Sequence, residues 1–318
     1  MKKKILVLMS TYNGEKYISQ QIDSILNQDC EHEIKLRIRD DGSSDDTVAI
    51  IKNYVSRFPN KIELIQGGNI GLNASFFNLI KNASGYDFYS LSDQDDIWLP
   101  NKLQVATSKI EKENKEMPLL YASISYLVHD DLIPYGVTRK KLRDFSIFNT
   151  IIQNICPGHT QVFNNLLLEY LKVDIDISNI YVYDSWITNI AILYGKILFD
   201  IEPNTLYRQH QSNNLGYGKG YLGRLITSYR HFENGDCLKY MLQAKYFIEK
   251  NKEELVKYNY YNELEKLFVG MSFMQKLKNI INSKIFRQNI IETILFKLCI
   301  LVSELDFEIK NNRTKKGK

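Results

Sequence analysis

Three carboxylates lie within four residues in the stretch Ser92-Asp93-Gln94-Asp95-Asp96-Ile97-Trp98-Leu99-Pro100, directly after the apolar run Phe88-Tyr89-Ser90-Leu91. The apolar run predicts a buried strand, so the carboxylates should cluster at the end of that strand. Like charges at this spacing repel one another, and a hard divalent cation such as Mg²⁺ or Mn²⁺ would offset the repulsion. The alternative is a solvated acidic turn without a ligand.

The residues before this stretch alternate between short apolar runs and amphipathic segments. We expect strands over residues 5–9, 34–38, 62–66 and 88–91, and helices over residues 16–27, 47–58 and 74–83. This order predicts a Rossmann-like α/β fold, in which a mostly parallel, twisted sheet is flanked by helices.

Polar motifs follow three of the expected strands: Ser10-Thr11-Tyr12-Asn13, Asp40-Asp41-Gly42-Ser43 and the acidic stretch itself. Ligands of parallel sheets bind at the carboxyl ends of the strands, so the three motifs should share one crevice. The first two motifs also fit turns and helix caps. Asp41 is surplus to capping, and its carboxylate could accept the imide N–H of a uracil or thymine base.

The second half of the sequence mixes strand and helix patterns and then becomes helical. We expect helices over residues 102–115, 145–155, 165–172 and 183–193, strands over 119–128, 160–163 and 197–201, a polar loop over 207–214, and tail helices over 221–232, 237–251, 260–274 and 288–309. Residues 1–215 carry 22 Lys and Arg against 26 Asp and Glu, whereas residues 216–318 carry 19 against 11. This asymmetry indicates an α/β domain over 1–215 and a basic helical region over 216–318.

The composition, with 44% hydrophobic and 25% charged residues in 318, is that of an ordinary globular protein. The four cysteines have no close pairing, which argues against a zinc site or a disulfide framework and favours a cytoplasmic location. The apolar run after Lys4 is too short for a signal peptide, and no apolar stretch has membrane-spanning length. The basic tail could contact an anionic membrane surface, or pack on the core or on a second copy. We expect no nucleic-acid partner.

Taken in order, several motifs resemble those of glycosyltransferase family 2, whose members are inverting enzymes of the GT-A fold. The motifs are Ser10-Thr11-Tyr12-Asn13-Gly14-Glu15, Ser24-Ile25-Leu26-Asn27-Gln28, Asp40-Asp41-Gly42-Ser43 and the acidic stretch continued to Leu103. The match spans residues 3–215. The acidic stretch, together with Tyr207-Arg208-Gln209-His210, is most similar to the rhamnosyltransferase-like branch, which makes bacterial surface polysaccharides.

The resemblance implies a donor site for a nucleotide sugar. Asp41 would hold the base, with Ser10, Thr11 and Tyr12 beside it, and Asp93 would lie near the ribose.

The resemblance also implies a metal site. Asp95 would bind Mg²⁺ or Mn²⁺, and His210 would add a metal or diphosphate contact. Arg208 could face the diphosphate, since a guanidinium pairs well with phosphate oxygens. The alternative for His210 is a surface-loop histidine, and Asp96 would support the site or cap a helix.

Asp184 matches the position of the family's general base, which takes the proton of the acceptor hydroxyl. The alternative is a helix-capping aspartate. Tyr183 departs from the acidic pair or His-Asp of many relatives, which leaves the acceptor side open. We expect Cys156 and His159, in a Gly-containing turn, to be structural.

The resemblance therefore implies a metal-dependent inverting glycosyltransferase that moves L-rhamnose from dTDP-rhamnose to a cell-surface polysaccharide or lipid-linked glycan. A UDP-hexose donor is an alternative. A nucleotidyltransferase would need a Gly-rich, basic loop after the first strand, and Ser10–Lys16 contains one Gly and no such pattern. A phosphohydrolase of the Asp-x-Asp type would carry that motif on the first strand. A catalytically silent scaffold of glycan synthesis would bind nucleotide without turnover.

Overall fold

The computed structural model describes residues 2–139, 142–209, 234–269 and 273–301. The chain divides into two compact units, of which the first comprises Met1–Leu142 and Asn154–Asn214 and the second comprises Arg143–Gln153 and Leu215–Lys318. The short segment Arg143–Gln153 groups with the second unit, although the sequence places it in the first region. The expected boundary after residue 215 lies outside the described residues and stays a prediction.

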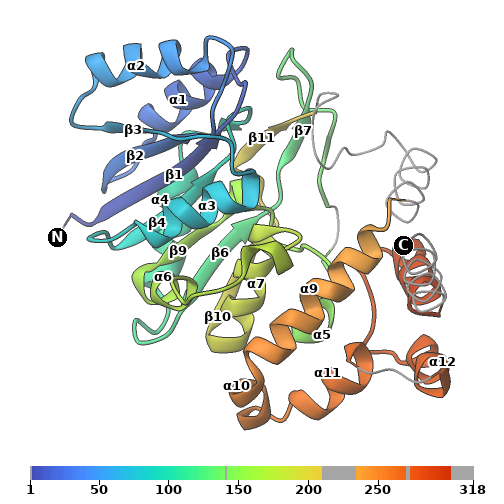
Figure 1. Ribbon diagram of the computed structural model, residues 1–318. Helices are drawn as coiled ribbons and strands as arrows, with labels where there is room; N and C mark the ends of the chain where they lie inside the picture. Colours follow the sequence, from blue (N-terminus) through green and yellow to red (C-terminus); the bar gives the residue numbers. More distant parts are fainter. Residues whose placement is uncertain (1, 140–141, 210–233, 270–272, 302–318) are drawn as a thin grey trace, which may run out of the picture. The chain divides into compact units, whose positions relative to one another are not determined.

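A seven-stranded sheet forms the centre of the first unit (Figure 1), with the strand order β10-β6-β9-β4-β1-β2-β3. Its strands are β1 (Lys4–Thr11), β2 (Glu33–Asp40), β3 (Ile62–Gln66), β4 (Phe88–Ser92), β6 (Leu119–Ser123), β9 (Val162–Asn164) and β10 (Lys196–Asp200). Strands β3, β2, β1 and β4 are parallel neighbours, β10 is parallel to β6, and β9 runs antiparallel between β4 and β6. The predicted α/β fold with a mostly parallel sheet is confirmed.

Helices cover both faces of this sheet. On one face, apolar side chains of α1 (Ile18–Leu26), α2 (Thr47–Arg57) and α4 (Lys102–Glu111) form one core with alternate residues of β1 and with residues of the neighbouring strands. Side chains alternate along a strand, so the remaining residues of β1 point to the opposite face. There α3 (Leu72–Lys81) packs on β1, with α6 (Asn165–Leu171) and α7 (Tyr183–Tyr194) beside it (Figure 1).

A small second sheet lies beyond the carboxyl ends of the central strands and was not predicted. It contains β5 (Ile97–Trp98), β11 (Thr205–Arg208), β7 (Tyr126–Val128) and β8 (Gly136–Val137), in that order. The single strand expected over residues 119–128 breaks after β6 and resumes as β7 in this sheet. The expected polar loop likewise begins as β11, because it pairs antiparallel with β5 and parallel with β7.

Other predicted elements of the middle of the chain are shorter than expected. The helix expected over residues 145–155 is the single turn α5 (Ile147–Thr150). The strand expected from residue 160 starts at Val162, because Gly158–Thr160 forms a 3₁₀ turn. A second 3₁₀ turn, Ile177–Asn179, precedes α7.

The described part of the second unit is helical. It contains α5, α9 (Asp236–Lys250), α10 (Lys252–Lys257), α11 (Tyr261–Phe268), α12 (Phe273–Ile281) and a further helix over residues 290–301. The helix expected over residues 221–232 lies outside the described residues. Among the helices that are described, none combines the length and the apolar character needed to cross a bilayer.

Gly195 joins α7 to β10 at a point of close backbone approach. A Cβ at this position would overlap the backbone oxygen of Pro118, which accepts a hydrogen bond from Lys196 N (3.0 Å). We expect Gly195→Ala to destabilise the protein by about 3 kcal/mol, since a paired backbone carbonyl cannot move aside. Thermal unfolding followed by circular dichroism measures the effect. Gly68→Ala is the matched control, because nothing lies within 4 Å of a Cβ there. Equal melting temperatures for the two variants would contradict this packing.

Candidate functional site

The loops that follow β1 and β2 are joined by hydrogen bonds between side chains and backbone. Asn13 N donates to Ser43 Oγ (2.9 Å), and Ser44 N donates to Asn13 Oδ1 (2.8 Å). Gly14 N donates to Thr47 Oγ1 (2.7 Å) at the start of α2. These bonds fix two of the three predicted polar motifs against each other.

Gln94 joins the acidic loop, residues 93–96, to the loop that follows β1. Its Oε1 accepts from Tyr12 N (2.9 Å) and its Nε2 donates to Tyr12 O (3.0 Å), so the side-chain amide pairs with the backbone as a neighbouring strand would. A Cβ on Gly14 would overlap the Gln94 side chain, which explains the glycine at this position. The three polar motifs therefore meet at the carboxyl ends of β1, β2 and β4, as the sequence predicts.

Asp41 forms a buried ion pair with Arg39, whose Nη1 lies 2.5 Å from Asp41 Oδ1. The same carboxylate accepts hydrogen bonds from the backbone N–H groups of Ile70 and Gly71, both at 2.9 Å. It thus holds the loop between β3 and α3 against β2. The predicted contact between Asp41 and a nucleobase stays a prediction.

The other residues expected around the base differ in exposure. Ser10 is buried, with its hydroxyl 2.6 Å from that of Ser75, and Thr11 Oγ1 donates to Asp40 Oδ1 (3.0 Å). Tyr12 is 48% exposed, so its side chain lies at the surface of the crevice.

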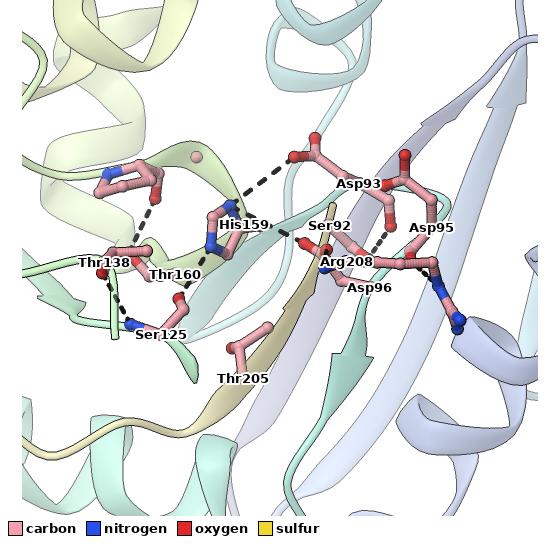
Figure 2. A network of polar contacts seen from close by, with 12 residues as sticks. Ser92, Asp93, Asp95, Asp96, Ser125, Thr138, His159, Thr160, Thr205 and Arg208 are labelled. Carbon is pink, nitrogen blue, oxygen red and sulfur yellow. Dashed lines mark hydrogen bonds and ion pairs between the residues drawn. The ribbon is translucent and has the colours of Figure 1, made fainter. Parts of the chain in front are cut away.

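Asp96 carries the most deeply buried carboxylate of the acidic loop (Figure 2). Its Oδ1 accepts from Arg208 N (3.2 Å), while its Oδ2 has no hydrogen-bond partner among the described residues. Burial, followed by the charges of Asp95 and Asp93, raises the pKa of Asp96 well above its ordinary value. Reduced hydration and the charges of Asp95 and Asp184 likewise raise the pKa of Asp93, whose side chain is 32% exposed. The loop therefore concentrates negative charge that favours a bound cation.

Lys102, at the start of α4, is a fully buried cation next to this loop. Its Nζ lies 3.7 Å from the centroid of the Trp98 ring and donates to the backbone oxygen of His159. Burial lowers the pKa of Lys102 well below its ordinary value, while the charges of Asp96 and Asp93 oppose that shift. The sequence analysis did not identify Lys102, because nothing in the sequence distinguishes a buried lysine from a surface one.

Arg208 fixes the backbone of the acidic loop from β11. Its Nε donates to Asp95 O (2.9 Å), its Nη2 donates to Gln20 Oε1 (2.6 Å), and its guanidinium lies over the Tyr17 ring at 4.5 Å. Arg208 is only 1% exposed. Its predicted contact with a diphosphate stays a prediction.

His159 lies beside the acidic loop, where the sequence predicts only a structural residue (Figure 2). Its Nδ1 is 3.8 Å from a carboxylate oxygen of both Asp93 and Asp96, and its Nε2 is 2.9 Å from Ser125 Oγ. The ring stacks on Tyr207 with 4.6 Å between centroids. Burial, aided by the charge of Lys102, lowers the pKa of His159 to about 3, so the imidazole is neutral at pH 7.

A divalent cation fits the ligand atoms that this loop offers. Asp93, Asp96 and His159 each offer one ligand atom, and these three atoms lie within 4.8 Å of one another. Asp96 Oδ2 is buried and has no hydrogen bond among the described residues. Carboxylate oxygens with one imidazole nitrogen suit Mn²⁺, and the oxygens suit Mg²⁺. The predicted ligand His210 lies outside the described residues, so its pairing with Asp95 stays a prediction. A second group of possible ligands comprises Glu31, His32 and Glu111. In this group a cationic side chain already pairs with a carboxylate, because Lys3 Nζ lies 2.8 Å from Glu111.

Asp184, in the first turn of α7, accepts three hydrogen bonds. Its Oδ2 accepts from Asn154 Nδ2 and Gly158 N, both at 2.7 Å, and its Oδ1 accepts from Ser185 N (2.8 Å). Burial raises its pKa to about 6, although these three donors oppose the shift. Val182 is the N-cap of α7, so Asp184 does not occupy the capping position of the alternative interpretation.

Tyr183 connects the acidic loop to Asp184. Its hydroxyl lies 3.5 Å from Asp93 Oδ1, and its ring stacks on Phe76 with 4.1 Å between centroids. A Cβ on Gly158 would overlap the Tyr183 hydroxyl, so the glycine leaves room for this ring. Tyr183, which departs from the family pattern, thus lies between Asp93 on the predicted donor side and the predicted base Asp184.

Comparison with known proteins agrees with this geometry. Residues 6–156 match the family described as Glycosyl transferase family 2. The chain is 31% identical to the dTDP-rhamnosyl transferase RfbG of Shigella flexneri over 224 residues. These residues cover 65% of this chain and 73% of that protein.

Solved structures show the same fold. TarS 1–349 of S. aureus, in complex with UDP-GlcNAc, has a TM-score of 0.56 and 17% identity over 96% of this chain and 92% of that one. The mannosyltransferase PcManGT of Pyrobaculum calidifontis, in complex with GDP-Man and Mn²⁺, has a TM-score of 0.57 and 13% identity over 96% and 76%. The fold of this chain is therefore the GT-A fold of glycosyltransferases.

The buried pair Arg39–Asp41 should matter far more for stability than the more exposed pair Arg37–Glu63, which joins β2 to β3. We expect Asp41→Asn to destabilise the protein by about 3 kcal/mol or more, because it leaves a buried guanidinium unpaired. Glu63→Gln, which removes the more exposed partner of Arg37 (3.0 Å), should cost about 1 kcal/mol or less. Urea unfolding of the two variants measures both values. Similar losses would show that the Asp41 carboxylate does not hold the loop as described.

Proposed function

The chain belongs to glycosyltransferase family 2, and we propose that it transfers L-rhamnose from dTDP-rhamnose, with inversion, to a cell-surface polysaccharide or a lipid-linked glycan. The observation that carries this proposal is the acidic loop, which the side chains of Gln94 and Arg208 hold at the carboxyl end of β4. The choice of donor rests on the likeness to a protein named as a dTDP-rhamnosyl transferase.

The donor nucleotide would bind across the ends of β1 and β2. In this proposal the base stacks on the exposed Tyr12, and its imide N–H donates to Asp41, beside Ser10 and Thr11. Asp93, partly exposed, would accept from the ribose. Arg208 would act chiefly by keeping the backbone of the loop in place, since its guanidinium already binds Gln20 and Asp95 O.

Asp95 would hold Mg²⁺ or Mn²⁺, with His210 as a further ligand. Such a cation, when bound, stabilises the negative charge that develops on the leaving nucleoside diphosphate. The neutral imidazole of His159 would support the same site, together with Asp96 Oδ2, which has no hydrogen bond among the described residues.

Asp184 would act as the general base. As the acceptor hydroxyl gives its proton to the carboxylate, the oxygen forms its bond to the anomeric carbon and the bond to the diphosphate breaks on the opposite side. The hydrogen bonds from Asn154 and Gly158 fix the position of this carboxylate, which would face the acceptor. Its raised pKa of about 6 makes it a better proton acceptor than an exposed aspartate.

A UDP-hexose is the second candidate donor, because a structurally similar protein was solved with UDP-GlcNAc. Hydrolysis and transfer assays with dTDP-rhamnose and with UDP-hexoses in parallel test the choice. We expect turnover with dTDP-rhamnose only; turnover with a UDP-hexose alone would replace the rhamnosyl proposal by the second one. We further propose that the enzyme acts in the cytoplasm, at the inner face of the cell membrane.

Asp95→Ala should abolish transfer and also the metal-dependent part of nucleoside-diphosphate binding, since the remaining carboxylates cannot replace a direct ligand of the cation. Calorimetric titration of dTDP with and without Mn²⁺ measures this part directly. Asp131→Ala, which removes an exposed carboxylate outside the loop, is the control. An active Asp95→Ala variant with unchanged metal dependence would rule out Asp95 as a ligand.

Asp184→Asn should lower kcat about a hundred- to ten-thousand-fold, because an amide cannot take a proton at neutral pH. The wild-type rate should fall as the pH decreases through about 6, where the base becomes protonated. The rate of the variant should not show this decrease. The melting temperature should also fall, since Asn places an N–H₂ opposite the Gly158 or Asn154 donors.

The rate, and not the stability, therefore separates the two interpretations of Asp184. Dissociation constants for dTDP should remain within about threefold of wild type. A folded variant that melts lower but keeps a near-normal kcat and an unchanged pH profile would assign Asp184 a structural role only.

A further inference from the structure

Helix α12 of the second unit presents its apolar side to the outside. Met274, Leu277 and Ile281 are 63%, 39% and 83% exposed, and their spacing of three and four residues places them on one side of the helix. Its buried positions include the polar residues Lys276 and Asn279, at 2% and 1% exposed. Surface helices normally turn their apolar stripe inward, so α12 is oriented in the reverse sense.

The helix over residues 290–301, in the same unit, shows a second exposed stripe. Ile290, Ile294 and Leu298 are 65%, 52% and 47% exposed and recur every four residues. Its inner side is also apolar, with Phe296 and Ile300 fully buried. A helix that is apolar on both sides is typical of a segment with partners on both sides.

Isolated apolar side chains at a surface are ordinary and need no explanation. These six differ because they form two regular stripes on two helices of one unit, which marks a surface for interaction. We call the six residues the apolar stripes.

The charge around the apolar stripes identifies the kind of partner. Residues 273–301 contain five basic residues, of which Lys276 and Arg287 are buried, and one acidic residue, Glu292. Lys278, on α12, is exposed, as is Lys284, three residues after the end of α12, whose Nζ also lies 2.6 Å from Glu263. A second copy of the chain would bring like charges together, whereas anionic lipid headgroups would complement them while the apolar side chains enter the acyl boundary.

We propose that α12 and residues 290–301 form a docking surface for an anionic lipid membrane. This inference gives the residues for the membrane location in the proposed function and rests on it in that respect. Docking there would keep the enzyme at the surface that carries a lipid-linked acceptor.

Vesicle flotation tests the proposal on the full-length protein. Vesicles of phosphatidylcholine are compared with vesicles that also contain phosphatidylglycerol, using wild type, Met274→Glu/Ile281→Glu and Ile290→Glu/Ile294→Glu. The matched control is Ile133→Glu/Ile201→Glu, which changes two isoleucines of the first unit that are 65% and 64% exposed.

Wild type should float only with the anionic vesicles, and each stripe variant should bind them at least about tenfold more weakly, since two apolar anchors are replaced by negative charges. The control should bind like wild type, and all variants should keep their melting temperature within a few degrees. Equal binding by the stripe variants, or equal loss in the control, would overturn the proposal.

Light scattering provides the second reading. If wild type is a dimer that the stripe variants convert to a monomer, the stripes are an interface between copies and the membrane proposal fails. Donor hydrolysis, measured without vesicles, is expected to be the same in all variants. It therefore reports separately on the proposed glycosyl transfer.

Discussion

Electrostatic repulsion among Asp93, Asp95 and Asp96 is the constraint around which the first unit is built. Three carboxylates follow one buried strand, and the structure brings polar partners to them from distant parts of the chain. The basic residues Lys102, from α4, and Arg208, from β11, lie beside them, as does the neutral imidazole of His159, from the 3₁₀ turn before β9. The compensation of charge is incomplete, because Asp96 Oδ2 has no hydrogen bond among the described residues and the pKa values of Asp93 and Asp96 remain raised. A divalent cation would complete it.

The crevice around this loop is fixed before any ligand arrives. Hydrogen bonds exchanged between Gln94 and Tyr12, and one donated by Ser44 N to Asn13 Oδ1, hold the ends of three strands in one arrangement. Buried ion pairing of Arg39 with Asp41 adds the loop after β3. Such preorganisation lowers the entropy lost on binding and keeps charged groups aimed at the place where charge develops.

Local patterns predicted the first half of the fold well, because apolar periodicity and the turn motifs mark β1 to β4 and α1 to α3 within short stretches of sequence. The second sheet could not be predicted, since β5 and β8 have two residues each and exist only through pairing with distant strands. The same reason applies to the site. The position of Asp184 followed from a family resemblance, whereas the roles of Lys102 and His159 depend on burial that no local pattern reports.

The central claim is that the acidic loop binds a divalent cation together with a nucleoside diphosphate. Calorimetric titration of wild-type protein with dTDP, in Mn²⁺ and in EDTA, tests it most directly. The account predicts that Mn²⁺ tightens binding by at least about tenfold, which corresponds to about 1.4 kcal/mol. Equal affinity in Mn²⁺ and in EDTA would contradict it.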